Sequence, residues 1–197
     1  MVELETLKKI IVEYQQFLGT VELTTRDFTF EPNGKYVMVG VRHAGKFYLL
    51  YQRARQLVAD GHSIEEMCYV NFDDERLIGL KASSLGDILT AYRSLFDRTP
   101  IFFFDEIQNI EGWEHFARRL ANEKYQVFIT GSNATMLSRE IATTLGERYL
   151  TKEVLPYSFA EFLRANGVNL GRNWRYGHEA GAVARLCESY LRDVGFP

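Results

Sequence analysis

Two glycines and a lysine stand at fixed spacing in the run Gly40-Val41-Arg42-His43-Ala44-Gly45-Lys46, which is a G-x-x-x-x-G-K pattern. An apolar run precedes it at 36–40 and helical spacing follows from 46, the strand–loop–helix context that this pattern requires. Glycines let backbone N–H groups turn toward an anion, the helix start adds its positive end, and the lysine adds a mobile charge. We therefore predict a phosphate-binding loop whose contacts extend into the helix at Phe47 and Tyr48. The alternative is a glycine-rich turn with an exposed lysine.

Two adjacent carboxylates, Asp105 and Glu106, directly follow the apolar run 101–104. Carboxylates at the end of so apolar a strand are costly unless they are paired or used. In P-loop ATPases the aspartate at this place holds Mg²⁺, usually through water, and the adjacent glutamate orients and activates the attacking water. We therefore expect Asp105 to hold a metal and Glu106 to act as the catalytic base. The alternative is an acidic pair that caps the next helix.

Polar residues also end the next apolar run, at Thr130-Gly131-Ser132-Asn133. If the strands are neighbours, these side chains lie between a bound γ-phosphate and the acidic pair. The same residue types also favour a turn followed by a helix N-cap, so the segment by itself supports both interpretations equally.

The elements that position these residues alternate along the chain. Helical spacing is found at 3–18, 46–59, 85–96, 113–121, 158–165 and 179–194, and short strands are expected at 36–40, 68–72, 101–104, 126–130 and 149–155. The central strands are apolar on both faces, which is typical of a parallel sheet covered on both sides by helices. We therefore predict an α/β fold.

Length and composition limit the function classes. The chain has 197 residues, 46% of them hydrophobic, with a net charge of −3, which argues against a constitutive nucleic-acid coat protein. No signal peptide is recognised, and no apolar run reaches the ~20 residues that a membrane-spanning helix needs. Cys68 and Cys187 form no disulfide framework. We expect a cytoplasmic protein without a membrane partner.

Five segments carry a resemblance to a known family: GVRHAGKFYLLYQ, NFDDERL, FFFDEIQNIEGWEHFARRL, FITGSNATMLSREIATTLGERYL and PYSFAEFL. Together they resemble prokaryotic AAA-superfamily P-loop ATPases in which the ATPase portion precedes a C-terminal domain of unknown function. The resemblance covers most of residues 20–165 in the expected order. It implies a P-loop three-layer α/β/α sandwich with a mostly parallel sheet, with the phosphate-loop strand in its middle and with ATP and Mg²⁺ as ligands.

The resemblance also implies roles for four residues. Ser132 or Asn133 senses the γ-phosphate, and Arg148 or Arg139 is an arginine finger that acts in cis or from a neighbouring subunit of a homo-oligomer. The alternative for each arginine is a solvated surface charge.

The sequence departs from the family pattern inside the loop. Phe47 replaces the Ser or Thr that normally gives Mg²⁺ an oxygen, and His43 replaces a residue that is commonly arginine. Tyr48 carries a hydroxyl, but one helical residue turns it about 100° away from that place. We therefore expect an ATPase with an atypical Walker A motif and weak hydrolysis.

Three parts are expected along the chain. Residues 1–30 form a helix and lead-in, 31–165 the ATPase domain, and 166–197 a linker and helix leading into a C-terminal domain that this chain lacks and that offers a place for a protein partner. Two other functions stay open: a degenerate P-loop scaffold for protein interaction, kept open by Phe47, and a nucleic-acid-handling ATPase, which the net charge does not favour. No motif separates ATP from GTP.

Overall fold

A five-stranded sheet forms the centre of the computed structural model, which describes residues 2–131, 143–177 and 179–193. The strand order is β2-β3-β4-β1-β5 and all four pairings are parallel. The strands are β1 (Tyr36–Val39), β2 (Met67–Asn71), β3 (Ile101–Asp105), β4 (Gln126–Gly131) and β5 (Leu150–Glu153). The predicted parallel α/β fold is confirmed. β1 is an interior strand, as expected, although β4 holds the central place.

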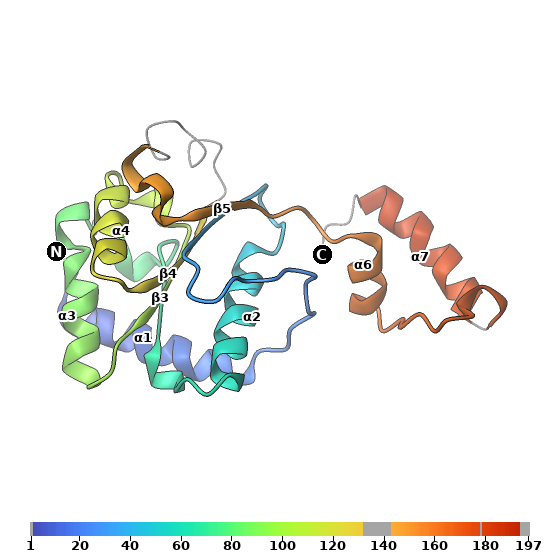
Figure 1. The fold of residues 1–197 in the computed structure, drawn as a ribbon, viewed down its shortest axis with the longest axis horizontal. Coiled ribbons are helices and arrows are strands. Elements are labelled where there is room, and N and C mark those ends of the chain that lie inside the picture. Colours follow the sequence, from blue (N-terminus) through green and yellow to red (C-terminus); the bar gives the residue numbers. More distant parts are fainter. Residues whose placement is uncertain (1, 132–142, 178, 194–197) are drawn as a thin grey trace.

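Helices cover both faces of the sheet, as Figure 1 shows. These helices are α1 (Leu4–Thr20), α2 (Lys46–Ala59), α3 (Gly86–Leu95) and α4 (Trp113–Asn122), and two more, α6 (Phe159–Ala165) and α7 (Glu179–Asp193), follow β5. α3 and α4 pack on one face and α2 packs on the other, while α1 lies along β2 and α3. Each expected helix and strand is present, with ends within two residues of the expected ones.

Alternation along the strands builds two separate cores. On β3, Phe102 and Phe104 face α3 and α4, whereas Ile101 and Phe103 face α2. The other strands follow the same period of two, because successive side chains of a strand point to opposite faces. The residue that ends each strand therefore lies on a predictable face, and Asp105 belongs to the face of α2.

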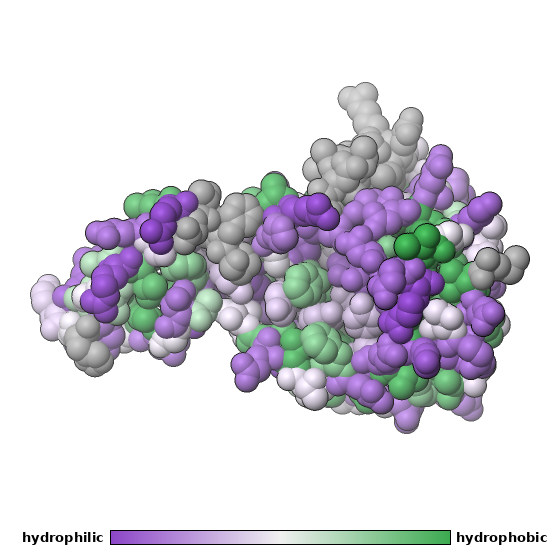
Figure 2. All heavy atoms as spheres, turned by 180° about the vertical axis from the view of Figure 1, so that it is seen from behind, coloured by the Kyte–Doolittle hydropathy of each residue, from purple (hydrophilic) through white to green (hydrophobic). Residues whose placement is uncertain are grey.

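α6 and α7 form a helical unit beyond the end of β5, and Figures 1 and 2 show it extending from the main body. A capping box of Ser158 and Glu161 begins α6. The ring of Tyr190 on α7 packs against Phe159 and Phe162, and its hydroxyl donates to the carbonyl oxygen of Tyr157 at 2.9 Å. In the described part of the chain, no helix has the length and apolarity needed to cross a membrane.

Candidate functional site

The loop between β1 and α2 has a backbone that few other sequences could adopt. A Cβ on Gly40 would lie 2.2 Å from the carbonyl oxygen of Val154, so only glycine fits beside the chain that leaves β5. Gly45 has φ of +80° and His43 has φ of +63°, both in the left-handed region. Such positive-φ residues turn successive N–H groups toward one side, which makes a concave anion site at the start of α2.

Lys46 opens α2 and is buried within this loop, with 4% of its surface exposed. Its Nζ donates to the carbonyl oxygens of Gly40 at 3.1 Å and Val41 at 3.0 Å, and lies 3.8 Å from Oε1 of Glu106. Burial lowers the pKa of Lys46, while the carboxylates of Glu106 and Asp105 oppose that shift. The loop thus holds a cation directly opposite the acidic pair.

Asp105 ends β3 on the face of α2, almost fully buried with 5% exposed. Its Oδ2 accepts a hydrogen bond from the hydroxyl of Tyr69 at 3.0 Å, and its Oδ1 accepts one from the hydroxyl of Thr130. Burial raises the pKa of Asp105 to about 6, although both hydroxyls favour the ionised form. Three neighbouring strands therefore supply this buried network, since Tyr69 lies on β2 and Thr130 on β4.

Glu106 follows in a strained conformation, with φ of +52° although it carries a side chain. Its N–H donates to Oγ1 of Thr130 at 3.2 Å and its Oε2 accepts from Nε2 of Gln108. A left-handed residue other than glycine costs about 1–2 kcal/mol. Strain of this kind at an ionisable residue that faces a lysine is typical of a functional position.

A cavity of about 320 Å³ joins these groups. Five of the nine loop residues predicted from the sequence line it, and Tyr48 is not among them. Four residues that the prediction did not include also line it or lie against it: Tyr51, Asn71 and Asp73 on the wall, and Tyr69 behind Asp105. The lining loop residues are Arg42, His43, Gly45, Lys46 and Phe47.

Phe47 lines the cavity mouth without filling it. The residue is 39% exposed, and its ring packs on Tyr48, with ring centroids 4.1 Å apart, and edge-on against Tyr51 at 5.8 Å. The three rings hold one another at the first turn of α2. No side-chain oxygen of the helix therefore stands where a Ser or Thr at position 47 would place one.

The residues around Asp105 offer few oxygen ligands for Mg²⁺. Mg²⁺ usually keeps several waters and binds proteins through one or two carboxylates together with substrate phosphates. Asp105 offers a carboxylate whose oxygens already accept two hydroxyl hydrogen bonds, and Phe47 offers no oxygen. Across the described residues, no three His, Cys, Asp or Glu side chains form a metal cage. These residues fit Mg²⁺ held mainly by water and nucleotide.

The remaining predicted residues lie elsewhere. Arg148 precedes β5 and donates from Nε to Oδ1 of Asn122 at 2.7 Å. Leu150 lies opposite Tyr36 at the start of β1, so Arg148, two residues earlier, lies at the N-terminal end of the strands, whereas the loop leaves β1 after Val39 at the other end. Arg148 therefore lies at the end of the strands away from the loop of its own chain, although β5 is the direct neighbour of β1. Ser132, Asn133 and Arg139 fall outside the described residues.

A second, more apolar cavity of about 460 Å³ adjoins the loop on the side of α6. Arg26 separates it from the loop, because its Nη1 donates to the carbonyl oxygen of Ala44 at 2.9 Å. Leu49, in the first turn of α2, forms part of its wall. The lining further includes Phe28, Val154, Leu155, Tyr157, Glu161 and Tyr190.

Comparison with known sequences gives a family match. The sequence profile of a family described as AAA domain matches residues 33–163. An uncharacterised protein of Methanocaldococcus jannaschii is 34% identical over 192 residues, which are 96% of this chain and 42% of that protein. An uncharacterised protein of Haemophilus influenzae is 34% identical over 163 residues, 82% of this chain and 39% of that protein. The chain thus spans about two fifths of the length of these curated relatives.

Two solved structures are similar to this chain over part of their own length. Cdc6p from Pyrobaculum aerophilum is 15% identical with a TM-score of 0.47, over 83% of this chain and 47% of that one. AMPPCP-bound DnaA from Aquifex aeolicus is 13% identical with a TM-score of 0.48, over 94% of this chain and 59% of that one.

Proposed function

Because the chain belongs to the AAA domain family and is thus an ATP-binding AAA module, we propose that it binds Mg-ATP through the loop 40–46. The observation that carries the proposal is the position of Lys46, whose Nζ lies inside the loop and 3.8 Å from Glu106. The loop supplies N–H donors and a buried cation for the phosphates. Asp105 and Glu106 supply the carboxylates on the facing strand end.

Each of these residues has a distinct task. Lys46 transfers its hydrogen bonds from the carbonyl oxygens of Gly40 and Val41 to the outer phosphate oxygens. Mg²⁺, when bound, offsets charge on the β- and γ-phosphates. Asp105 orients the waters around that ion. Glu106 orients a water toward the γ-phosphate and accepts its proton, because its carboxylate is at the cavity wall and its backbone is fixed by Thr130.

Hydrolysis is proposed to be weak. The helix offers no oxygen at position 47, and the oxygens of Asp105 are shared with two hydroxyl donors. Poor placement of the ion reduces rate more than affinity, because the charge that it offsets is largest in the transition state.

The second cavity is proposed to take the base. It begins at Leu49, one turn of α2 beyond the phosphate loop, and its volume of about 460 Å³ lies in the usual range for small-molecule sites. Its walls are mainly apolar, with the rings of Phe28, Tyr157 and Tyr190 available for stacking.

Arg148 is proposed to act between subunits. Its position at the end of the strands away from the loop of its own chain favours a role at the loop of a neighbouring copy. We also propose that 31–165 is the ATPase unit and that 166–197 leads toward a further domain, since the curated relatives are longer than this chain.

A degenerate scaffold is the second candidate, favoured by Phe47 and by the hydroxyl bonds to Asp105. It predicts nucleotide binding without turnover, or no binding at all. Phosphate release at saturating Mg-ATP separates it from an ATPase.

Calorimetry with ATP and GTP tests the proposed binding. Lys46→Ala should weaken ATP binding by about 1.5–3 kcal/mol, the contribution of a charged hydrogen bond. Lys152→Ala is the matched control, since Lys152 is an exposed lysine on β5. Absence of binding by the wild-type chain at millimolar nucleotide would reject the proposal.

A further inference from the structure

Arg26 lies outside every helix and strand, yet its side chain is one of the most extensively bonded in the structure. Only 9% of that side chain is exposed. Its Nη1 donates to the carbonyl oxygen of Ala44 at 2.9 Å, and its Nη2 donates to that of Leu155 at 2.8 Å. Its Nε donates to Oε1 of Glu161 at 2.9 Å. One guanidinium thus links the phosphate loop, the chain after β5, and α6.

The bond to Ala44 fixes the orientation of one loop peptide. In a trans peptide the C=O of one residue and the N–H of the next point in opposite directions, and the described residues contain no cis peptide. Arg26 holds the Ala44 carbonyl on its own side of the loop. The N–H of Gly45 must then point away from Arg26, toward the cavity that Gly45 and Lys46 line.

Glu161 on α6 holds Arg26 in this position. Its side chain is 6% exposed, and its Oε1 accepts from both Nε of Arg26 and the N–H of Asp27, the latter at 2.7 Å. Its Oε2 accepts the N–H of Ser158 at 2.8 Å. A buried carboxylate with all of these bonds cannot release Arg26 without leaving charges unpaired, at a large energetic cost.

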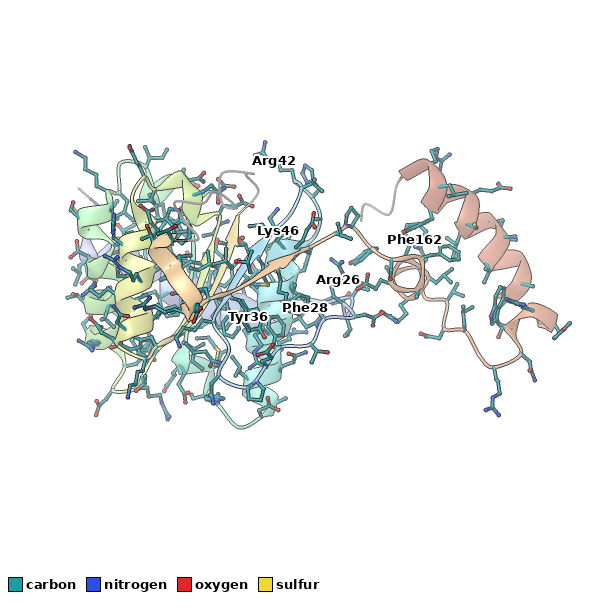
Figure 3. All side chains as sticks on the ribbon, turned by 45° about the horizontal axis from the view of Figure 1, so that its top comes forward. Arg26, Phe28, Tyr36, Arg42, Lys46 and Phe162 are labelled. Carbon is teal, nitrogen blue, oxygen red and sulfur yellow. The ribbon has the colours of Figure 1, made fainter. Side chains whose placement is uncertain are left out.

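α6 packs on α7 and not on the sheet. The position of Glu161 is therefore determined by the position of the α6–α7 unit. Figure 3 shows Arg26 between Lys46 of α2 and Phe162 of α6. A second, more exposed ion pair also joins α6 to the segment that contains Arg26, with Nη2 of Arg164 at 2.7 Å from Oδ1 of Asp27. That pair does not touch the loop.

We propose that Arg26 is a positioning residue for the phosphate loop and that its bond to Glu161 makes the loop's ability to bind phosphate depend on the position of the α6–α7 unit. The proposal rests on the proposed function for its ligand, a nucleoside triphosphate. Its structural part, the orientation of the Ala44–Gly45 peptide, does not need that ligand.

The first test uses the nucleotide-free chain and amide hydrogen exchange in peptides that cover 40–46. Arg26→Met keeps the length of the side chain but removes its donors, and it should raise exchange of the loop amides at least tenfold. Glu161→Gln keeps an oxygen that can accept from Nε of Arg26, and it should raise exchange of the loop amides about threefold. Asp27→Asn removes only the exposed ion pair with Arg164, and it should leave exchange of the loop amides within twofold of wild type. Loop exchange unchanged in Arg26→Met would overturn the proposal, whatever the ligand.

The second test measures affinity for inorganic triphosphate, which has no base and therefore reports on the loop rather than on the neighbouring cavity. Arg26→Met should weaken binding at least tenfold, and Arg26→Lys, which keeps a charged donor for Ala44, should stay within about threefold of wild type. Glu161→Gln should have no further effect in the Arg26→Met background. Additive effects of the two changes would mean that Glu161 does not act through Arg26, and would reject the link to α6.

Failure of the proposed function can be distinguished from failure of the proposed role of Arg26. If the wild-type chain binds neither ATP nor triphosphate, the proposed function is wrong, and the exchange test still decides the role of Arg26. If the wild type binds and Arg26→Met binds equally well, the function stands and Arg26 is only a structural link. Should Arg26→Met fail to fold, Glu161→Gln with its Asp27→Asn control decides both measurements.

Discussion

Tyr69→Phe removes one buried hydroxyl and tests the network around Asp105. Tyr69 is fully buried on β2, and its hydroxyl donates to Oδ2 of Asp105 at 3.0 Å. The substitution changes no volume in the core beyond that oxygen. Tyr92→Phe is the matched control, because Tyr92 is equally buried and donates a single bond to the carbonyl oxygen of Glu65, far from the site.

The expected size follows from the charge on the acceptor. A hydrogen bond to an ionised group contributes about 1.5–3 kcal/mol, and 1.36 kcal/mol corresponds to one pKa unit. The pKa of Asp105, raised by burial to about 6, should therefore rise by about one to two further units. At pH 7 the aspartate would change from about nine-tenths ionised to half ionised or less.

The pH dependence of the free energy of unfolding reports the shift in the pKa of Asp105 without any ligand. The pKa of Asp105 in the folded chain lies above its ordinary value of 3.8, so the folded state holds this proton more tightly. Its contribution to stability is complete below pH ~4 and is lost as pH rises to about 6, by about 3 kcal/mol in all. In Tyr69→Phe the loss should continue to pH 7–8, adding about 1.5–3 kcal/mol.

Urea unfolding of the nucleotide-free variants at pH 5 and pH 8 measures this difference. Tyr69→Phe should lose more stability between the two pH values than wild type, whereas Tyr92→Phe should not. In the ATPase assay, the acidic limb of the rate profile should move upward in pH by one to two units. Equal pH dependence of unfolding in wild type and Tyr69→Phe would refute the reasoning.

Three further predictions concern the loop and its surroundings. Phe47→Ser should raise Mg²⁺-dependent phosphate release at least tenfold, about 1.4 kcal/mol of barrier, and Glu106→Gln in that background should remove the gain. Gly40→Ala should destabilise the fold by more than about 1 kcal/mol in urea unfolding, because its Cβ would lie 2.2 Å from the Val154 carbonyl oxygen; a neutral result would contradict the close approach. Arg148→Ala should abolish any faster-than-linear rise of ATPase rate with protein concentration, and a linear rate in wild type would remove Arg148 from the site.

The sequence was sufficient for the fold and for the placing of the loop and the acidic pair at strand ends, because both depend on local patterns. The apolar run 101–104 followed by Asp105 and Glu106 predicted a buried strand that ends in two carboxylates, and the structure has β3 end at Asp105. The period of two also determined which face each strand end would occupy. The same rule could have found Asn71, which ends β2 opposite Asp105 on the same face.

Other parts of the site depend on contacts that no local pattern encodes. Arg26 and Glu161 are 135 residues apart, and an arginine in an irregular segment has no periodicity from which its partner could be inferred. Tyr69 looked like an ordinary strand residue, because its ring fills the core and only its hydroxyl reaches Asp105. Arg148 was expected near the nucleotide in cis or in trans, and only the register of β5 shows that it lies at the end of the strands away from the loop.

The loop has more of the groups that its proposed task needs than the proposed metal position has. We therefore expect nucleotide binding to be more robust than turnover. The phosphate loop keeps its glycines, its left-handed backbone and a buried Lys46, none of which needs a metal. The proposed metal position has no side-chain oxygen at Phe47 and would share Asp105 with two hydroxyls. The proposed function therefore assigns the binding energy mainly to the loop and makes turnover depend on the metal position. Under the proposals made for Lys46, Arg26 and Glu161, such a chain would respond to nucleotide through α6 even with slow hydrolysis.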